Sequence, residues 1–145
     1  MNSSRQALMQ IDLAVGSPIE VGQGRRCIPI KGGQVTGAFG GTVMPGGADW
    51  QRIAADGTIE IDARYVLELA EGRVEVGSRG LRAATPDILA RLAAGEAVDP
   101  SLYYFRTAIR FQTEVPALQR LNRILAISHG ERRADAVQLT IYEVP

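Results

Sequence analysis

Clear alternation of apolar and polar residues over 58–68 constrains the fold of this chain more than any other feature. One face of this segment carries Ile59, Ile61, Ala63, Tyr65 and Leu67. A period of two is typical of a β-strand that buries one face. Asp56-Gly57 and Glu71-Gly72 flank the segment, and such pairs favour tight hairpin turns. The segment therefore predicts antiparallel pairing with its neighbours along the chain.

Other strand-length segments fill most of the sequence. We expect strands at residues 8–15, 26–31, 39–44, 49–54, 58–68, 73–82, 102–113, 121–128 and 136–144. Gly32-Gly33 is interpreted as the end of the second strand. One short helix is expected between Thr85-Pro86, which resembles a capped start, and Gly95, which favours a stop.

Short connections between so many strands favour an all-β fold with antiparallel pairing. A sheet of this size tends to close or to split into two layers. We predict a single antiparallel β-barrel of eight to nine strands over residues 1–145, with a β-sandwich as the alternative. An eight-stranded barrel can hold one small ligand.

Composition excludes several classes of protein. Of the 145 residues, 46% are hydrophobic and 22% are charged, which is typical of neither a disordered chain nor a membrane protein. The formal net charge is zero, whereas nucleic-acid binders usually carry a basic excess. Residues 1–15 lack the apolar segment of a signal peptide. We expect a cytoplasmic protein with neither nucleic acid nor membrane as partner, and a homodimer as the commonest assembly for its size.

Cys27 and His129 are the only cysteine and histidine in the chain. They exclude an internal disulfide and a zinc site built from Cys and His within one chain. We expect no metal and no other cofactor. Cys27 lies in an apolar segment and is predicted to be a small buried side chain rather than a nucleophile.

Asp49, Trp50 and Gln51 follow the turn sequence at 45–47, where a loop is expected to enter a strand. In one interpretation they form a binding site at the barrel rim, with Trp50 as a stacking wall and the two polar residues as contacts. In the other, Asp49 caps the turn and Trp50 belongs to the core.

Two pairs of polar residues share the face opposite the apolar one on their strands: Asp62 with Arg64, and Tyr104 with Arg106. If these faces point into the barrel, they would bring together two guanidinium groups, a carboxylate and a phenol suited to an anionic oxygen. Asp62 or Asp49 could then serve as general base. Alternation alone favours the opposite, a solvated outer face with ion pairs between strands.

Three runs carry a resemblance to a known family: MPGGADWQ at 44–51, DARY at 62–65 and YYFRT at 103–107. LN at 121–122 and GER at 130–132 follow in the same order. Together they resemble the bacterial family called domain of unknown function 3237, also named UPF 0311. The resemblance spans about residues 8–144 and implies a calycin-like β-barrel. It departs at Phe111-Gln112-Thr113-Glu114, where the family often has Phe-Glu-Thr-Gly, so it implies no carboxylate role for position 112.

These observations leave three functions open. The first is a cofactor-free lyase, isomerase or hydrolase-type enzyme acting on a small oxygenated or aromatic compound. Its candidate catalytic residues are Asp49, Asp62, Arg64 and Arg106, and its candidate ligand-binding residues are Trp50, Gln51, Tyr65, Tyr104 and Asn122. The second is a carrier or sensor of a small apolar ligand. The third is a structural subunit of an oligomer.

Overall fold

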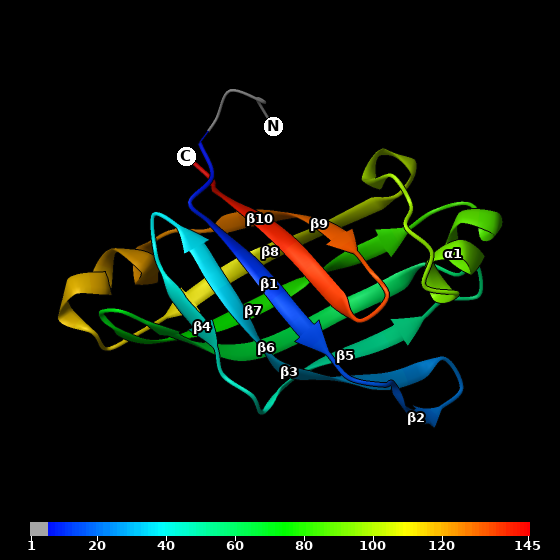
Figure 1. Cartoon of the computed structure of the whole chain (residues 1–145), viewed down its shortest axis with the longest axis horizontal. Helices are drawn as coiled ribbons and strands as arrows, with labels where there is room; N and C mark the ends of the chain where they lie inside the picture. Colours follow the sequence, from blue (N-terminus) through cyan, green and yellow to red (C-terminus); the bar gives the residue numbers. More distant parts are fainter. Residues whose placement is uncertain (1–5) are drawn as a thin grey trace.

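The computed structural model describes residues 6–145, which form a ten-stranded antiparallel sheet curled into a barrel (Figure 1). The strands are β1 (Met9–Val15), β2 (Ile19–Gly22), β3 (Arg25–Gly37), β4 (Gly41–Val43), β5 (Gly47–Ile53), β6 (Ile59–Leu69), β7 (Gly72–Ala83), β8 (Tyr104–Gln112), β9 (Ala126–Arg132) and β10 (Ala136–Glu143). The predicted antiparallel barrel is confirmed.

The barrel closes through β1, which pairs with β10 on one side and with β3 on the other. From β10 the ring continues through β9, β8, β7 and β6. β4 and β5 then occupy successive lengths of the gap between β6 and β3, because each of them pairs with both strands. β2 pairs with β3 and was not expected from the sequence; all four of its residues are exposed, so no burial pattern indicates it.

The prediction that Gly32-Gly33 ends a strand is wrong, because β3 runs through both residues to Gly37. β1 and β3 approach closely here: a Cβ atom on Gly33 would lie 1.9 Å from the carbonyl oxygen of Asp12. The register between the two strands also shifts at Ala14/Val15. These glycines therefore permit close backbone contact and bending where the barrel closes, which is a common role of glycine inside strands.

The predicted strand at 121–128 is displaced toward the C-terminus. Residues Pro116–Arg123 form a 3-10 helix, η2, whose Leu118 and Leu121 are buried. The two leucines are three residues apart, which matches the three-residue turn of this helix type. β9 begins only at Ala126 and includes His129, which packs against the ring of Tyr142.

The expected helix is confirmed as α1 (Pro86–Ala93), with Thr85 at its start and Gly95, at φ +80°, just beyond its end. A short 3-10 helix, η1 (Pro100–Leu102), precedes β8. In Figure 1, α1 lies at one end of the barrel and η2 at the other. Within residues 6–145, no helix combines the length and the apolar character needed to cross a membrane.

The barrel interior is divided along its length. Near η2 it is filled by side chains with almost no exposure, including Leu67, Val74, Ile109 and Phe111. Further along β6, β7 and β8, toward α1, the inward residues line a cavity instead. The same strands thus provide a packed core at one end and a hollow at the other.

Candidate functional site

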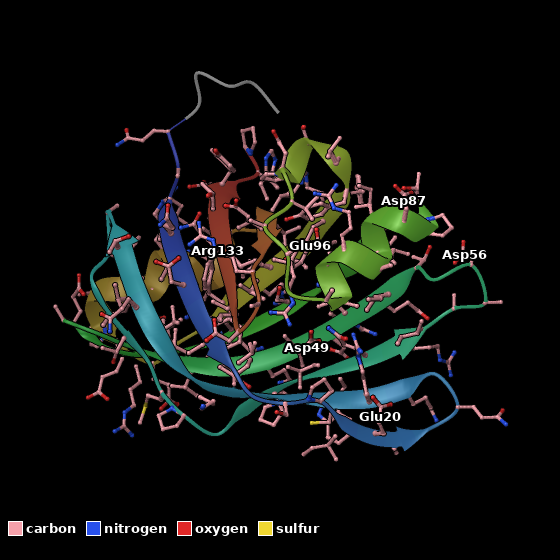
Figure 2. The ribbon with its side chains drawn as sticks, turned by 45° about the vertical axis from the view of Figure 1, so that its right-hand side comes forward. Glu20, Asp49, Asp56, Asp87, Glu96 and Arg133 are labelled. Atoms are coloured by element: carbon pink, nitrogen blue, oxygen red, sulfur yellow. The ribbon has the colours of Figure 1, made fainter. Side chains whose placement is uncertain are left out.

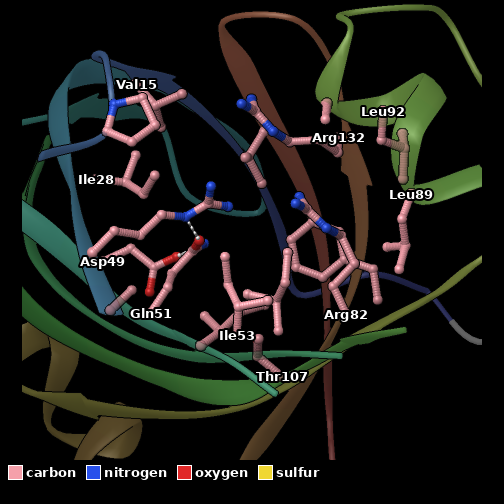
Figure 3. A pocket seen from close by; sticks show the side chains of 18 of the residues that line it. Val15, Ile28, Asp49, Gln51, Ile53, Arg82, Leu89, Leu92, Thr107 and Arg132 are labelled. Atoms are coloured by element: carbon pink, nitrogen blue, oxygen red, sulfur yellow. Dashed lines mark hydrogen bonds between the residues drawn. The ribbon is translucent and has the colours of Figure 1, made fainter. Parts of the chain in front are cut away.

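The cavity has a volume of about 740 Å³ and is lined by residues from eight strands and from α1. Most of its lining is apolar, and Leu89 and Leu92 of α1 contribute at the barrel mouth (Figure 3). Its polar lining residues inside the barrel are Arg26, Asp49, Gln51, Tyr65, Ser78, Arg82, Thr107 and Arg132. An apolar pocket with a few converging polar groups is the usual form of a small-molecule site.

Hydrogen bonds from its own strand β5 and from β6 hold Asp49 in place, and β3 supports them through Gln51. Gln51 Nε2 donates to Asp49 Oδ2 at 2.7 Å, and Arg26 Nε donates to Gln51 Oε1 at 2.8 Å. The backbone N–H of Asp62 donates to Asp49 Oδ1 at 3.0 Å. Asp49 and Gln51 share the inward face of β5, and Arg26 lies opposite Gln51 on β3. The carboxylate orientation is therefore fixed before any ligand arrives.

Burial raises the pKa of Asp49 above its usual value of 3.8. Hydrogen bonds from Gln51 and Asp62 and the positive charge of Arg82 oppose this effect without cancelling it. Figure 2 shows Asp49 inside the barrel, whereas Asp56 and Asp87 lie at its periphery. A carboxylate with a raised pKa is a stronger base, so Asp49 is suited to accept a proton.

Arg82 is the most deeply buried of the three arginines that line the cavity. Its side chain is 8% exposed, its Nε has no hydrogen-bond acceptor among residues 6–145, and its Cζ lies 5.8 Å from the ring centroid of Phe105. Burial, followed by the charges of Arg132 and Arg26, lowers the pKa of Arg82 to about 10. The guanidinium remains charged at neutral pH, so its N–H groups are available to an anionic ligand.

Arg132 and Tyr65 also belong to the polar lining of the cavity. Arg132 Nη1 donates to the Ala136 carbonyl at 3.1 Å, and burial lowers the pKa of Arg132. Tyr65 is 2% exposed, and its hydroxyl has no hydrogen-bond partner among the described residues. Burial and the nearby charge of Asp49 raise the pKa of Tyr65, so its hydroxyl stays neutral.

A row of three buried hydroxyls crosses β7, β8 and β9. Ser78 Oγ donates to Thr107 Oγ1 at 2.7 Å, and Thr107 Oγ1 lies 2.5 Å from Ser128 Oγ. Ser78 and Thr107 line the cavity. The row satisfies polar groups that would otherwise be costly in the barrel interior.

Of the residues predicted from the sequence, Asp49, Gln51 and Tyr65 line the cavity together. Trp50 does not join them, because it lies between Asp49 and Gln51 on β5 and points outward, with 58% of its surface exposed. The structure therefore supports neither interpretation of Trp50: it is not a wall of the cavity, and it does not belong to the core. The polar pair beside it faces inward, as a binding site requires.

Asp62, Arg64, Tyr104 and Arg106 lie on the outer face, so of the two alternatives for these residues the structure has the solvated outer face and not the meeting inside the barrel. Arg64 pairs with Glu75, and Asp62 Oδ1 lies 3.7 Å from Arg79 Nε. Arg106 lies over the ring of Tyr104, with its Cζ 5.5 Å from the centroid. Their polar strand face is the solvated one, as alternation alone predicts. Only the backbone of Asp62 reaches the site, through its hydrogen bond to Asp49.

Asn122 also lies away from the cavity. Its side chain accepts from the Thr113 N–H and donates to the Thr113 carbonyl, both at 2.8 Å. These bonds join η2 to the residues that follow β8 at the packed end of the barrel. The contacts of Asn122 are those of a structural residue that fixes this connection.

The three cavity arginines, Arg26, Arg82 and Arg132, were not identified from the sequence. A signal was present for Arg82, which shares the inward face of β7 with Val74, Val76 and Ser78. A charge that continues an apolar strand face requires a partner or a ligand. Within residues 6–145, no three His, Cys, Asp or Glu side chains are grouped so that they could hold a metal ion.

Fold and site together define a closed β-barrel protein whose mostly apolar interior cavity carries a few polar groups, and comparisons with known proteins place it in a family. The model of the family DUF3237, described as protein of unknown function, matches residues 4–144. A UPF0311 protein of Rhodopseudomonas palustris is 43% identical over 133 residues, which cover 90% of this chain and 87% of the relative. The chain belongs to this family.

Solved structures share the fold. A conserved protein of unknown function from Rhodopseudomonas palustris matches with a TM-score of 0.92 and 36% identity over the full length of both chains. A β-barrel-like protein from Acinetobacter baumannii matches with a TM-score of 0.81 and 31% identity, covering 97% of this chain and 94% of its own. An enzyme from Penicillium herquei has a TM-score of 0.65 at 21% identity over 98% of this chain and 100% of its own, which is a likeness of fold alone.

Proposed function

We propose that the cavity binds a small, partly apolar molecule and that Asp49 removes a proton from it. The protein would then be a cofactor-free enzyme of the isomerase or lyase type, acting on an oxygenated or aromatic compound. The observation that carries this proposal is the carboxylate of Asp49, oriented by Gln51 and Arg26 inside an apolar cavity and raised in pKa by its burial.

The proposed step is a proton transfer that needs no co-reactant. The carboxylate of Asp49 takes a proton from a C–H bond next to a carbonyl, and the electron pair of that bond passes into an enolate. The positive charge of Arg26, which is hydrogen-bonded to Gln51 beside Asp49, offsets the negative oxygen. Return of the proton to the same or a neighbouring atom completes an exchange or an isomerisation.

The test is deuterium exchange into 2-tetralone, a bicyclic ketone with acidic C–H bonds, followed by NMR in D₂O. We expect the protein to accelerate exchange above the buffer rate, and Asp49→Asn to reduce the acceleration by roughly 10²–10⁴-fold, the usual contribution of a general base. Asp62→Asn is the matched control, because Asp62 lies outside and contacts Asp49 only through its backbone.

Exchange that persists in Asp49→Asn would contradict the assignment of Asp49. Binding of 2-tetralone without exchange would favour the second function, a carrier of small apolar ligands, for which the same enclosed cavity is the supporting observation. A mass-spectrometric search for a molecule that co-purifies with the protein would then identify the natural ligand in either case.

A further inference from the structure

We infer that the ligand carries a permanent negative group, a carboxylate, which binds between Arg82 and Arg132 at the side of the cavity nearest α1. This inference rests on the proposed function, because it concerns the molecule that the cavity binds. It specifies two properties that the proposed function leaves open: the charge of the ligand, and the end of the cavity at which its charged group lies.

The first support is an imbalance of charge inside the barrel. Three guanidinium groups, from Arg26, Arg82 and Arg132, line the cavity, and Asp49 is the carboxylate that faces them from the interior. The remaining acidic lining residue, Asp56, is exposed and accepts a hydrogen bond from the backbone of Thr58. Buried cations of like sign are costly unless a negative group compensates them.

The second support is the state of Arg82. Nine-tenths of its side chain is buried, yet its Nε–H has no acceptor among residues 6–145. Arg26, in contrast, uses its Nε to bind Gln51, and Arg132 donates to a backbone carbonyl. Arg82 is therefore the cavity cation whose donors await an acceptor from outside the protein.

The third support is the way Arg82 is held. Its guanidinium lies over the ring of Phe105, and this ring packs against Gly130, where an added Cβ would lie 2.7 Å from the ring atoms. The ring supports one face of the cation and leaves its edge free. The edge of a guanidinium presents parallel N–H donors that match the two oxygens of a carboxylate.

Figure 3 shows Asp49 and Gln51 on one side of the cavity and Arg82 and Arg132 on the other, next to Leu89 and Leu92. A ligand that reaches both sides has an anionic end at the arginines and a reacting end at Asp49. Apolar side chains line the space between them, including Ile53, Ile59 and Ile61. The ligand class is thus an organic acid with an apolar, ring-sized body.

The test compares two probes of nearly equal shape, 2-naphthoate and the neutral 2-acetylnaphthalene, by calorimetric titration. We expect 2-naphthoate to bind roughly ten- to a hundredfold more tightly, the usual effect of hydrogen bonds to a charged group. Arg82→Gln should abolish this preference and leave the affinity for 2-acetylnaphthalene nearly unchanged. Arg79→Gln, an exposed arginine on the outer face of the same strand, is the control and should preserve it.

If Arg82→Gln fails to fold, Arg132→Gln tests the same site. This variant should also reduce the preference for 2-naphthoate over 2-acetylnaphthalene. Asp49→Asn separates this inference from the proposed function: removal of the interior carboxylate should strengthen naphthoate binding by lowering repulsion, while it removes proton exchange. Equal affinities for both probes would overturn the carboxylate site and leave the role of Asp49 intact. Failure of both probes to bind would overturn the inference together with ligand binding in the cavity.

Discussion

The arginines on the two faces of the barrel have different partners. On the outer face, Arg64 pairs with Glu75 and Arg79 lies near Asp62, and all four side chains are substantially exposed. On the inner face, Arg82 is buried against Phe105 without a hydrogen-bond acceptor. Arginines of the outer face thus form ion pairs with carboxylates, whereas no ion pair to Arg82 is found among residues 6–145.

This difference is the reverse of what stability alone would favour. Exposed ion pairs contribute little, whereas a buried cation without an acceptor is costly. Functional sites commonly carry such a cost, and removing it stabilises a protein at the expense of activity. If the cavity binds an anion as proposed, that ligand accounts for the cost of the buried Arg82, whereas the solvated outer arginines need no ligand.

The largest expected effect is on the free energy of unfolding, and it should differ between two neighbouring aromatic residues of β8. Phe105→Ala should lower the free energy of unfolding by about 3–5 kcal/mol, because it removes a buried ring and leaves a cavity beneath Arg82. Tyr104→Ala should change it by less than about 0.5 kcal/mol, since Tyr104 is exposed on the outer face. Urea unfolding measures both, and equal losses would contradict the assignment of inner and outer faces.

The second-largest expected effect is a gain, not a loss, in the free energy of unfolding. Arg82→Met should raise the free energy of unfolding of the empty protein by about 1–2 kcal/mol, because the gain from removing a buried unpaired donor exceeds the lost contact with Phe105. Arg79→Met should be near neutral. A destabilised Arg82→Met variant would show that Arg82 supports the barrel, and would remove the contrast between the two faces.

The third prediction compares an inner and an outer carboxyl group by pH. Burial raises the pKa of Asp49 above 3.8, so the folded state binds this proton more tightly than the unfolded state. The stability of the wild type relative to Asp49→Asn should therefore be greatest below pH 3.8 and fall as pH rises through the folded pKa. Unfolding measured across this range tests the sign.

Asp56 provides the control for this titration. Hydrogen bonds from Thr58 lower the pKa of Asp56, so its contribution is present above pH 3.8 and is lost as pH falls through the folded value. The relative stability of wild type and Asp56→Asn should thus change with pH in the opposite direction. Carboxyl carbon shifts measured by NMR should give a pKa above 3.8 for Asp49 and a pKa below 3.8 for Asp56. Two pKa values on the same side of 3.8 would refute the comparison.

The smallest effect concerns the outer ion pair. Arg64→Gln should lower the free energy of unfolding by at most about 1 kcal/mol, since Arg64 and Glu75 are both exposed to solvent. Added salt should reduce the difference further, because ions screen surface charges. A double-mutant cycle with Glu75→Gln measures the pair, and a larger salt-independent coupling would be inconsistent with a solvated outer face.

Local patterns predicted most of the fold. The inward residues of β6 were predicted from alternation along the strand, and the bounds of α1 from its flanking turn residues. Both signals come from residues only a few positions apart in the sequence. The extension of β3 through Gly33 did not, because its cause is the backbone of Asp12 on another strand. Contacts between distant segments leave little local trace in a sequence.

The candidate site was predicted only in part for a related reason. Asp49, Gln51 and Tyr65 were identified because they stand in recognisable motifs or on a clear strand face. Arg132 is the last residue of β9, where alternation has few residues left to establish a face. Arg82 continues the inward face of β7, but it stands outside the recognised motifs. Their meeting across the cavity depends on barrel closure, which no single segment specifies.

Closure through β1 also has a kinetic consequence. The hydrogen bond from Gln138 Nε2 to Asp12 Oδ1 joins residues 126 positions apart, and β1 contacts both β3 and β10. Bringing such distant segments together has a high entropic cost and slows folding. Until β10 has been synthesised and has paired with β1, the barrel cannot close around the cavity. We therefore expect the cavity to form in the last, slow phase of folding, so that a ligand present during refolding would stabilise the final state without accelerating the earlier phases.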